Sequence, residues 1–532
     1  MTQAEYQSMS PSDFFYRNRE IAGFSNPSRA IYASVRELVE NSLDACEARM
    51  VPPSIYLRIT EEVKAQDPTS ETSTSIYTMR IQDNGTGLPS EEIPRCFGQV
   101  FYGSKYTLKQ ARGTFGLGGT MTILFGQITT HKPVTIMSST GGEIHQYEMM
   151  IDIGKNCPII LQHKVIENKK GWMGTVVNLQ MEGDYSRIKS RLIEYLKQTA
   201  MVNPYADITF VDPSGRLFRF ERGTEKMPPL PQSVKPHPHG IDVENVRRLL
   251  NITKSKTLKD FMRTQFQGIG PTTAENFLKA AKMNSKTKPK SLKPQEVVKL
   301  VRAAKDYHDF KRPDASCLSP MGEELLETGI RKELNLADDD FLKVVTRKPA
   351  TYLGFPFIVE AAVASGRSIS KQFKSGTTII RFANRIPLLF DESSGVVWKA
   401  INKNINWSTY NVSSDTPLVI AVHVCSTKIP YKTVGKEYMA DQPELEKEIT
   451  NAIRTAARSL RVHISRRLRV AKDKRRMGIF EKYLPKVAEF AAKLSDHEEK
   501  PEILPLLKVV STALPIVEKK VAEVPIIVGN DS

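Results

Sequence analysis

The chain has 532 residues and a formal net charge of +17 at pH 7. This length is enough for about three or four domains with separate cores, and the excess of Lys and Arg favours attraction to polyanions such as nucleic acid. Its five cysteines contain no C-x-x-C pair, which argues against a zinc knuckle or a disulfide framework. No signal peptide opens the chain and no apolar run reaches membrane-spanning length, so we expect a cytoplasmic protein with no membrane partner.

The first informative segment is predicted to be a helix that starts at Pro27 and Ser28, because apolar residues recur at helical spacing from position 30 to 43. Glu37 and Asn41 are four residues apart and project from one face of that helix. A carboxylate there can orient and deprotonate a water, and a carboxamide oxygen is a hard ligand suited to Mg²⁺. An amphipathic helix with a solvated polar face would show the same pattern, so this segment alone decides nothing.

The second segment is a predicted strand over residues 76–81, followed by Asp83, Gly85 and Gly87. A carboxylate fixed at a strand end can accept a hydrogen bond from an adenine amino group, and the glycines permit close backbone approach. The alternative is a D-N-G turn that closes a hairpin.

The third segment is rich in glycine between Gly113 and Gly119, follows Ser104 and Lys105, and leads into a helix predicted from Thr120. Successive backbone N–H groups in such a turn bind anions, and the dipole of the following helix adds to the attraction. Several glycines also suit a mobile lid. These glycines match neither the P-loop nor the dinucleotide-binding pattern, so a phosphate site here must be of another kind.

In this order, the motifs E-x-x-x-N-x-x-D-A, D-x-G-x-G and G-x-x-G-x-G resemble those of the GHKL ATPases, which include gyrase-type topoisomerases, Hsp90 chaperones, MutL proteins and histidine kinases. Within that set the chain resembles the B subunits of DNA topoisomerase VI, the type IIB enzyme. The closer match lies in residues 36–45, 103–105 and 426–437. The resemblance extends over nearly the whole chain and implies ATP and Mg²⁺ as ligands.

The resemblance also implies roles for individual residues. Glu37 would be the general base, Asn41 the Mg²⁺ ligand and Asp83 the adenine anchor. The nucleotide-binding set would comprise Asn41, Asp83, Gly85, Gly87, Ser104, Lys105, Gly113, Thr114, Phe115, Gly116, Leu117, Gly118, Gly119, Thr120 and Lys436.

A lysine from a separate downstream domain is expected to reach the γ-phosphate. Lys428, Lys432 and Lys436 lie in one loop, and each is also compatible with an ordinary solvated basic loop. We favour Lys436, as a second catalytic residue beside Glu37, because its place just before a predicted helix resembles the family's switch lysine.

The predicted fold is a multidomain α/β protein with four parts. A GHKL α/β sandwich with an N-terminal strap occupies residues 1–228. A small helix–two-turn–helix domain follows the Pro-rich linker and occupies 229–306. Strand-like runs indicate a second α/β domain, the transducer domain, at 307–470. A C-terminal stalk helix and tail complete the chain at 471–532.

Ten Lys and Arg residues crowd one predicted helical stretch, between Arg454 and Arg476. They form either a solvated helix face or a stalk that lies near DNA phosphates, where each neutralised phosphate would steepen the salt dependence of binding.

The function implied by the resemblance is that of the ATP-hydrolysing subunit of a type II DNA topoisomerase. Two B subunits would dimerise on binding ATP and clamp a DNA duplex. An A subunit would cleave and reseal a second duplex within an A₂B₂ assembly, so that strand passage relaxes and decatenates DNA. The alternatives are a MutL-like repair clamp and a DNA-binding scaffold that does not hydrolyse ATP. A chaperone fits the basic balance poorly, and no histidine precedes the ATP motifs as a histidine kinase would require.

Overall fold

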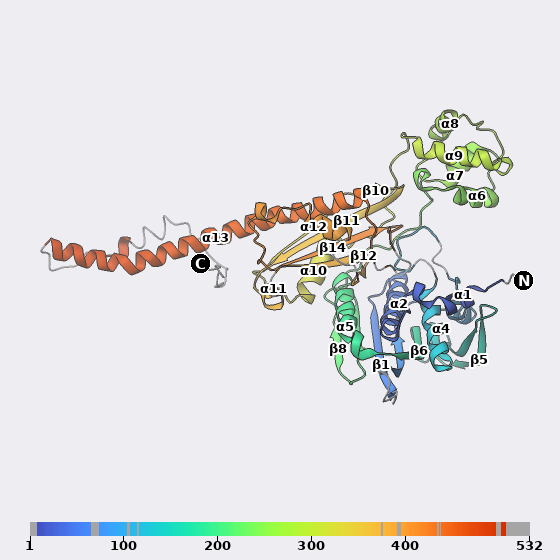
Figure 1. The fold of residues 1–532 in the computed structure, drawn as a ribbon, viewed down its shortest axis with the longest axis horizontal. Helices are drawn as coiled ribbons and strands as arrows, with labels where there is room; N and C mark the ends of the chain where they lie inside the picture. The colour runs from blue at the N-terminus through green and yellow to red at the C-terminus, as the bar shows by residue number, and fades with distance from the viewer. Residues whose placement is uncertain are drawn as a thin grey trace, which may run out of the picture.

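The computed structural model describes residues 8–64, 74–103, 107–113, 116–373, 376–390, 395–432, 436, 438–495 and 502–506. Figure 1 shows three packed parts: a sheet with helices, a small helical part, and a second sheet from which one long helix projects.

The first part contains an eight-stranded mixed sheet in the order β5-β4-β3-β6-β2-β1-β7-β8. Neighbouring strands are antiparallel except β1 and β7, which are parallel. The strands are β1 (Ser54–Lys64), β2 (Ser75–Gln82), β3 (Val134–Thr140), β4 (Ile144–Asp152), β5 (Cys157–Ile166), β6 (Met173–Gly183), β7 (Asp207–Val211) and β8 (Leu217–Phe220). The helices are α1 (Pro11–Arg17), η1 (Arg19–Ala22), α2 (Pro27–Ala48), α3 (Glu92–Gly98), α4 (Gly118–Thr130) and α5 (Tyr185–Val202).

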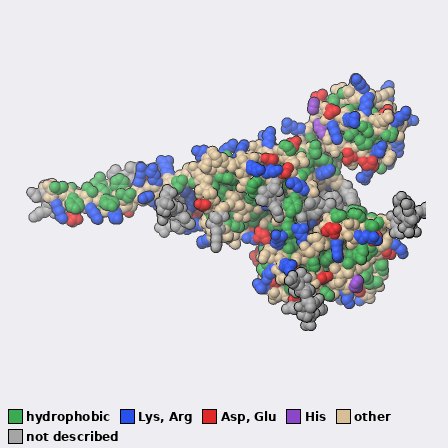
Figure 2. Space-filling view, viewed as in Figure 1, with side chains coloured by type: hydrophobic (Ala, Val, Ile, Leu, Met, Phe, Trp, Pro, Cys, Tyr) green, Lys and Arg blue, Asp and Glu red, His purple; other side chains and the backbone are tan. Residues whose placement is uncertain are grey.

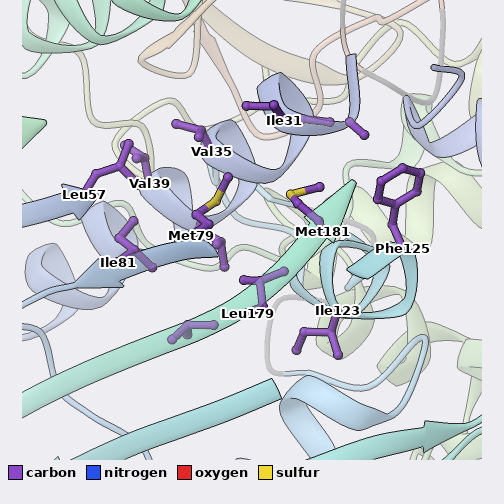
Figure 3. Close-up of a cluster of buried hydrophobic side chains, with 14 of the residues drawn as sticks. Ile31, Val35, Val39, Leu57, Met79, Ile81, Ile123, Phe125, Leu179 and Met181 are labelled. Carbon is purple, nitrogen blue, oxygen red and sulfur yellow. The ribbon is translucent and has the colours of Figure 1, made fainter. Parts of the chain in front are cut away.

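The core of this part lies between the sheet and the helices α2, α4 and α5. Ile31, Val35 and Val39 of α2 lie on the face that packs toward Met79 of β2 and Met181 of β6 (Figure 3). Burying each such side chain stabilises the fold by about 1.5–3 kcal/mol. This packing fixes the orientation of α2 and therefore the direction in which its polar side chains, such as Glu37 and Asn41, project.

Local signals account for the ends of these elements. The Asn26 side chain accepts a hydrogen bond from the Arg29 backbone N–H, and Pro27 stands in the first turn, so α2 begins where it was predicted. The strand predicted over 76–81 and the helix predicted from Thr120 are confirmed as β2 and α4.

The start of the chain packs on its own domain. The hydroxyls of Ser10 and Ser12 donate to the carbonyl of Ile153 at 2.6 and 2.8 Å, and Phe15 is buried. The described part of the N-terminal strap is therefore held against the turn that joins β4 to β5.

The second part is a helical unit with a core of its own. Phe261, Phe277 and Leu300 are fully buried within it. The preceding Pro-rich segment runs along it, with ring nitrogens of His237 and His239 lying 2.8 Å from the carbonyls of Lys311 and Tyr307. The elements are η2 (Pro238–Gly240), α6 (Val243–Ile252), α7 (Leu258–Gln265), α8 (Pro271–Ala280), η3 (Pro289–Ser291) and α9 (Pro294–Asp306).

The third part is built on a six-stranded sheet in the order β10-β11-β14-β12-β13, with β9 also paired to β11. Helices α12 and α13 cover one face, and α10 and α11 cover the other, so every residue of the central strand β14 is buried (Figure 1). The strands are β9 (Phe341–Thr346), β10 (Ala350–Tyr352), β11 (Phe355–Ser365), β12 (Thr377–Ala383), β13 (Ile386–Pro387) and β14 (Leu418–Ser426). The helices are α10 (Gly322–Glu333), α11 (Arg367–Gln372), α12 (Val396–Asn402), η4 (Trp407–Tyr410) and α13 (Pro443–Leu494).

Helix α13 is 52 residues long and leaves the sheet about a third of the way along its length (Figure 1). Leu445, Ile449, Ile453 and Leu460 pack on the sheet, whereas most later side chains are exposed. The helix runs without a break across residue 470, where the transducer domain was predicted to end, and it continues through Pro485. Among the helices that the structure describes, no span is both long and apolar enough to cross a membrane.

Candidate active site

A cavity of about 480 Å³ lies where α2, α4 and the loop after β2 meet the third part of the chain. That volume is within the usual range for a small-molecule site. The predicted residues that line it are Glu37, Asn41, Asp83, Gly87, Gly113, Gly116, Leu117, Gly118, Gly119, Thr120 and Lys436. Gly85 lies beside the cavity without lining it, and Ser104, Lys105, Thr114 and Phe115 lie outside the described residues.

The carboxylate of Glu37 projects into this cavity from the middle of α2. Its side chain is 15% exposed, and Arg36 Nη2 donates to its Oε1 at 2.8 Å. A Cβ at Gly118 would lie 1.8 Å from Glu37 Oε2. Glycine at this position therefore lets the first turn of α4 approach the carboxylate of Glu37, and any side chain at position 118 would push that carboxylate away.

Asp83 is held rigidly at the end of β2. The Ser42 hydroxyl donates to its Oδ2 at 2.9 Å, and the backbone N–H groups of Gly85 and Thr175 donate to Oδ1 at 2.9 and 3.2 Å. Burial raises the pKa of this carboxyl, and the three hydrogen bonds oppose that rise. Gly87 has φ +64° and leaves no room for a Cβ beside the carbonyl of Ser139, so its glycine is also required.

The first turn of α4 supplies hydrogen-bond donors at the wall of the cavity next to Glu37. Gly118, Gly119 and Thr120 form this turn and line the cavity. The first backbone N–H groups of a helix have no partner within the helix, and the helix dipole gives them a partial positive charge. This wall is suited to binding phosphate.

The three candidate lysines occupy different environments. Lys436 is 6% exposed and its Nζ donates to the backbone carbonyl of Arg112 at 2.8 Å, although Lys436 belongs to the third part of the chain. The exposed Lys428 has its Nζ 4.9 Å from the centre of the Phe355 ring, and the exposed Lys432 pairs with Asp441. Of these three, only Lys436 lines the cavity.

Glu40 is a buried neighbour of Lys436, and neither of its carboxylate oxygens has a hydrogen bond within the described part of the structure. Its Oε2 is 3.9 Å from Lys436 Nζ, and its Oε1 is 3.7 Å from Arg36 Nε. Burial raises the pKa of Glu40, while the charge of Lys436 opposes the rise.

A buried ionic cluster continues from the cavity along α2, and sequence reasoning missed it. Arg112 pairs with Asp44 at 2.8 Å and with Glu47 at 2.6 Å, and it also donates to Asn203. Arg385, from the third part, lies 3.4 Å from Glu47. Burial alone would raise the pKa of Glu47, but the charges of Arg112 and Arg385 lower it overall. The positions of Asp44 and Glu47, on the face of α2 that carries Glu37, were the available signal.

Comparison with known families agrees with this geometry. Residues 26–146 match the family of histidine kinase-, DNA gyrase B- and HSP90-like ATPases, and residues 313–476 match the topoisomerase VI B subunit transducer family. The fold and site thus define an ATPase of the GHKL class joined to a transducer domain, as the sequence predicted.

Two curated relatives narrow the class. The B subunit of type 2 DNA topoisomerase 6 from Saccharolobus islandicus (strain L.S.2.15) is 42% identical over 92% of this chain and 90% of its own length. The corresponding protein from Saccharolobus solfataricus (strain P2) is 41% identical with the same coverage. The chain belongs to the family of type 2 DNA topoisomerase 6 B subunits.

Among solved structures, the 43K ATPase domain of Thermus thermophilus gyrase B aligns with 92% of this chain and 98% of its own. Its identity is 14% and its TM-score is 0.40, so the family assignment rests on the sequence relatives.

Proposed function

We propose that this chain binds and hydrolyses ATP as the B subunit of a type II DNA topoisomerase, and that it couples nucleotide state to the capture of a DNA duplex. One observation carries the proposal: Lys436, from the transducer domain, lies in the same cavity as Glu37, Asn41 and Asp83. A lysine so placed links events at the phosphates to movement of a second domain.

In the proposed reaction, Glu37 orients the attacking water and takes its proton. Its place in the cavity, opposite the first turn of α4, suits a base that acts close to the γ-phosphate. Asp83 accepts a hydrogen bond from the adenine amino group, and the N–H groups of residues 118–120 bind the phosphates. Positioning of this kind supplies most of the catalysis in phosphoryl transfer.

The donor set suits Mg²⁺. Within the described residues, no three His, Cys, Asp or Glu side chains gather into a metal cage, but the exposed carboxamide of Asn41 faces the cavity beside Glu37. Mg²⁺ prefers oxygen ligands and takes much of its shell from water and phosphate, so one protein oxygen is sufficient. Asn41 would hold the ion, which neutralises charge on the phosphates when bound.

Coupling follows from the contact between Lys436 and Arg112. The carbonyl of Arg112 directly precedes the first glycine of the phosphate loop, Gly113. If the lysine amine binds the γ-phosphate, ATP favours one angle between the ATPase and transducer domains over others. Such a change is a population shift driven by the better affinity of ATP for the closed arrangement.

The partners are proposed from exposed surfaces. Basic side chains on α13 are available to DNA phosphates. Exposed apolar side chains gather near the far end of α13 (Figure 2), where we place the A subunit of an A₂B₂ assembly. The exposed apolar side chains near this end of α13 are Ile479, Phe480, Tyr483, Val487, Phe490 and Leu494.

We place the ATP-dependent contact between two B subunits at the N-terminal part, which exposes Met9, Phe14 and Phe101.

The test is the ATPase rate of the full chain with and without duplex DNA, alone and mixed with a candidate A subunit. We expect DNA to stimulate hydrolysis, and supercoil relaxation to require the mixture. Hydrolysis indifferent to both additions would favour a MutL-like clamp instead. Absence of hydrolysis under every condition would leave a DNA-binding scaffold.

A further inference from the structure

A tight turn of the transducer domain reaches into the ATPase domain, and its two residues line the cavity. Asn384 and Arg385 join β12 to β13, with Ala383 paired to Ile386. Their φ angles are +48° and +65°. A two-residue hairpin turn with positive φ at both positions is of type I′, in which glycine is the favoured residue at the second position. Arginine rarely adopts positive φ, so a residue held there needs compensating contacts, and in Arg385 the side chain makes them.

The side chain of Asn384 holds the base of the phosphate loop. Its Nδ2 donates to the carbonyl of Ala111 at 3.1 Å. The next carbonyl, that of Arg112, accepts the hydrogen bond from Lys436. Two consecutive carbonyls directly before Gly113 are thus bound by transducer residues that are far apart in the sequence.

The side chain of Arg385 holds α2 to the same loop. It is 4% exposed, donates from Nη1 to the Tyr205 hydroxyl at 2.9 Å, and lies 3.4 Å from Glu47 Oε1. The same carboxylate oxygen accepts from Arg112 at 2.6 Å and from Tyr205 at 2.6 Å. Arg385 therefore completes a cluster that joins the helix carrying Glu37 to the residue before Gly113.

The turn is itself anchored in the transducer core. The backbone N–H of Arg385 donates to His423 Nε2 at 3.1 Å, so the Nδ1 of this histidine carries the proton that is shared with Glu360 at 2.7 Å. Glu360 also accepts from the backbone N–H groups of Met321 and Gly322 at the start of α10. The contacts of the turn thus continue, through buried groups, from the phosphate loop to α10.

We propose that Asn384 and Arg385 are positioning residues of the ATPase site, and that they form a second link between the transducer domain and the phosphate loop besides Lys436. The inference rests on the proposed function. The role proposed for them acts through residues 111 and 112 and needs no contact with ATP. Both hold residues 111–112 in place before the phosphates bind, so the loop has less freedom to lose on binding.

This role makes a specific kinetic prediction. If the turn is lost, ATP must order the loop itself, so the KM for ATP rises, whereas at saturation the ordered loop supports nearly normal kcat. A turn that merely joins the two domains would behave otherwise. Its loss would lower the melting temperature and the active fraction, and hence kcat, without changing KM.

The experiment compares four variants of the whole chain, the fourth being Arg385→Lys. Arg385→Met removes the ionic contact, and Asn384→Gly removes the donor to Ala111 while it keeps the positive φ accessible. The matched control is Arg347→Met, because Arg347 pairs with Glu448 inside the transducer domain. The KM for ATP, kcat and melting temperature are measured for each variant and for the wild type.

We expect Arg385→Met and Asn384→Gly to raise KM by about tenfold and to keep kcat within about threefold, and the control to match the wild type. The KM of Arg385→Lys should lie between those of Arg385→Met and the wild type, because lysine keeps the positive charge but lacks the planar, multiply donating guanidinium group. Unchanged KM in both turn variants would overturn the proposal. Failure of the proposed function would look different, since the wild type itself would then not hydrolyse ATP.

Discussion

The charges around the cavity and the charges along α13 are arranged in opposite ways. Arg112, Arg385 and Lys436 are buried, and each contacts named atoms at fixed distances. The basic side chains of α13 are mostly exposed to solvent (Figure 2). Buried charges are weakly screened and set geometry, whereas exposed charges act through a field that salt weakens. We therefore expect substitutions in the first region to change chemistry and substitutions in the second to change salt-dependent binding.

The largest effect is expected at Glu37. Glu37→Ala removes the proposed base and should lower ATP turnover by about 10²-fold or more, while nucleotide binding persists. Single-turnover hydrolysis and equilibrium binding of a nonhydrolysable nucleotide measure the two effects separately. Glu143→Ala, at an exposed turn, is the control. Wild-type turnover in Glu37→Ala would remove this carboxylate from its role.

Asp83→Asn should weaken nucleotide binding by about ten- to a hundredfold. The substitution replaces a carboxylate oxygen by a donor in a site that already receives hydrogen bonds from Ser42, Gly85 and Thr175, so it removes both the adenine hydrogen bond and its support. Isothermal titration with ATP, together with a melting curve to separate binding from folding, measures the change. Unchanged affinity would contradict the assignment of Asp83 as the adenine anchor.

Along α13 the expected change is in salt dependence. Replacing Arg466 and Arg469 by Gln should lower duplex affinity and reduce the slope of log K against log salt by about one for each phosphate that is no longer neutralised. ATP hydrolysis without DNA should not change. A loss of hydrolysis with an unaltered salt slope would break the contrast between the two regions.

The smallest effect concerns acid stability. The pKa of Glu47 is lowered in the folded chain: burial acts to raise it, but Arg112 and Arg385 overcome that effect. A carboxyl with a depressed folded pKa adds stability above its unfolded pKa of about 4.3, and this stability is lost as pH falls further. Glu47→Gln should therefore be less stable than the wild type at neutral pH and show a shallower loss below about pH 4.3, which urea denaturation at several pH values would measure. If the unfolding free energies of the wild type and of Glu47→Gln changed in parallel with pH, the stabilising role of the ionised Glu47 would be contradicted.

Local patterns were sufficient to predict the elements that carry the motifs. Helix α2, strand β2 and helix α4 follow from apolar spacing, Pro27 and the glycines, because these signals act between near neighbours. That the three motifs meet in one site was implied by their resemblance to the GHKL ATPases, and the structure brings together the described residues of the set except Gly85.

The contacts between domains could not be predicted in the same way. Glu47 and Arg385 are 338 residues apart, so no local spacing relates them. Lys428, Lys432 and Lys436 look alike in sequence. What separates them is burial: Lys436, at φ +53°, is buried and contacts the carbonyl of Arg112, whereas Lys428 and Lys432 are exposed. Such placement depends on how the whole transducer sheet meets the ATPase domain.

The most direct test of the account compares these three lysines. ATP turnover is measured for Lys428→Gln, Lys432→Gln and Lys436→Gln in the same full-length chain, so that each variant removes one charge from one loop. We expect turnover to fall by about 10²-fold for Lys436→Gln alone, as for removal of a group that contacts developing charge, and to stay within about twofold for the other two. Full activity in Lys436→Gln, or an equal loss in Lys428→Gln or Lys432→Gln, would contradict the claim that Lys436 couples the transducer domain to the nucleotide.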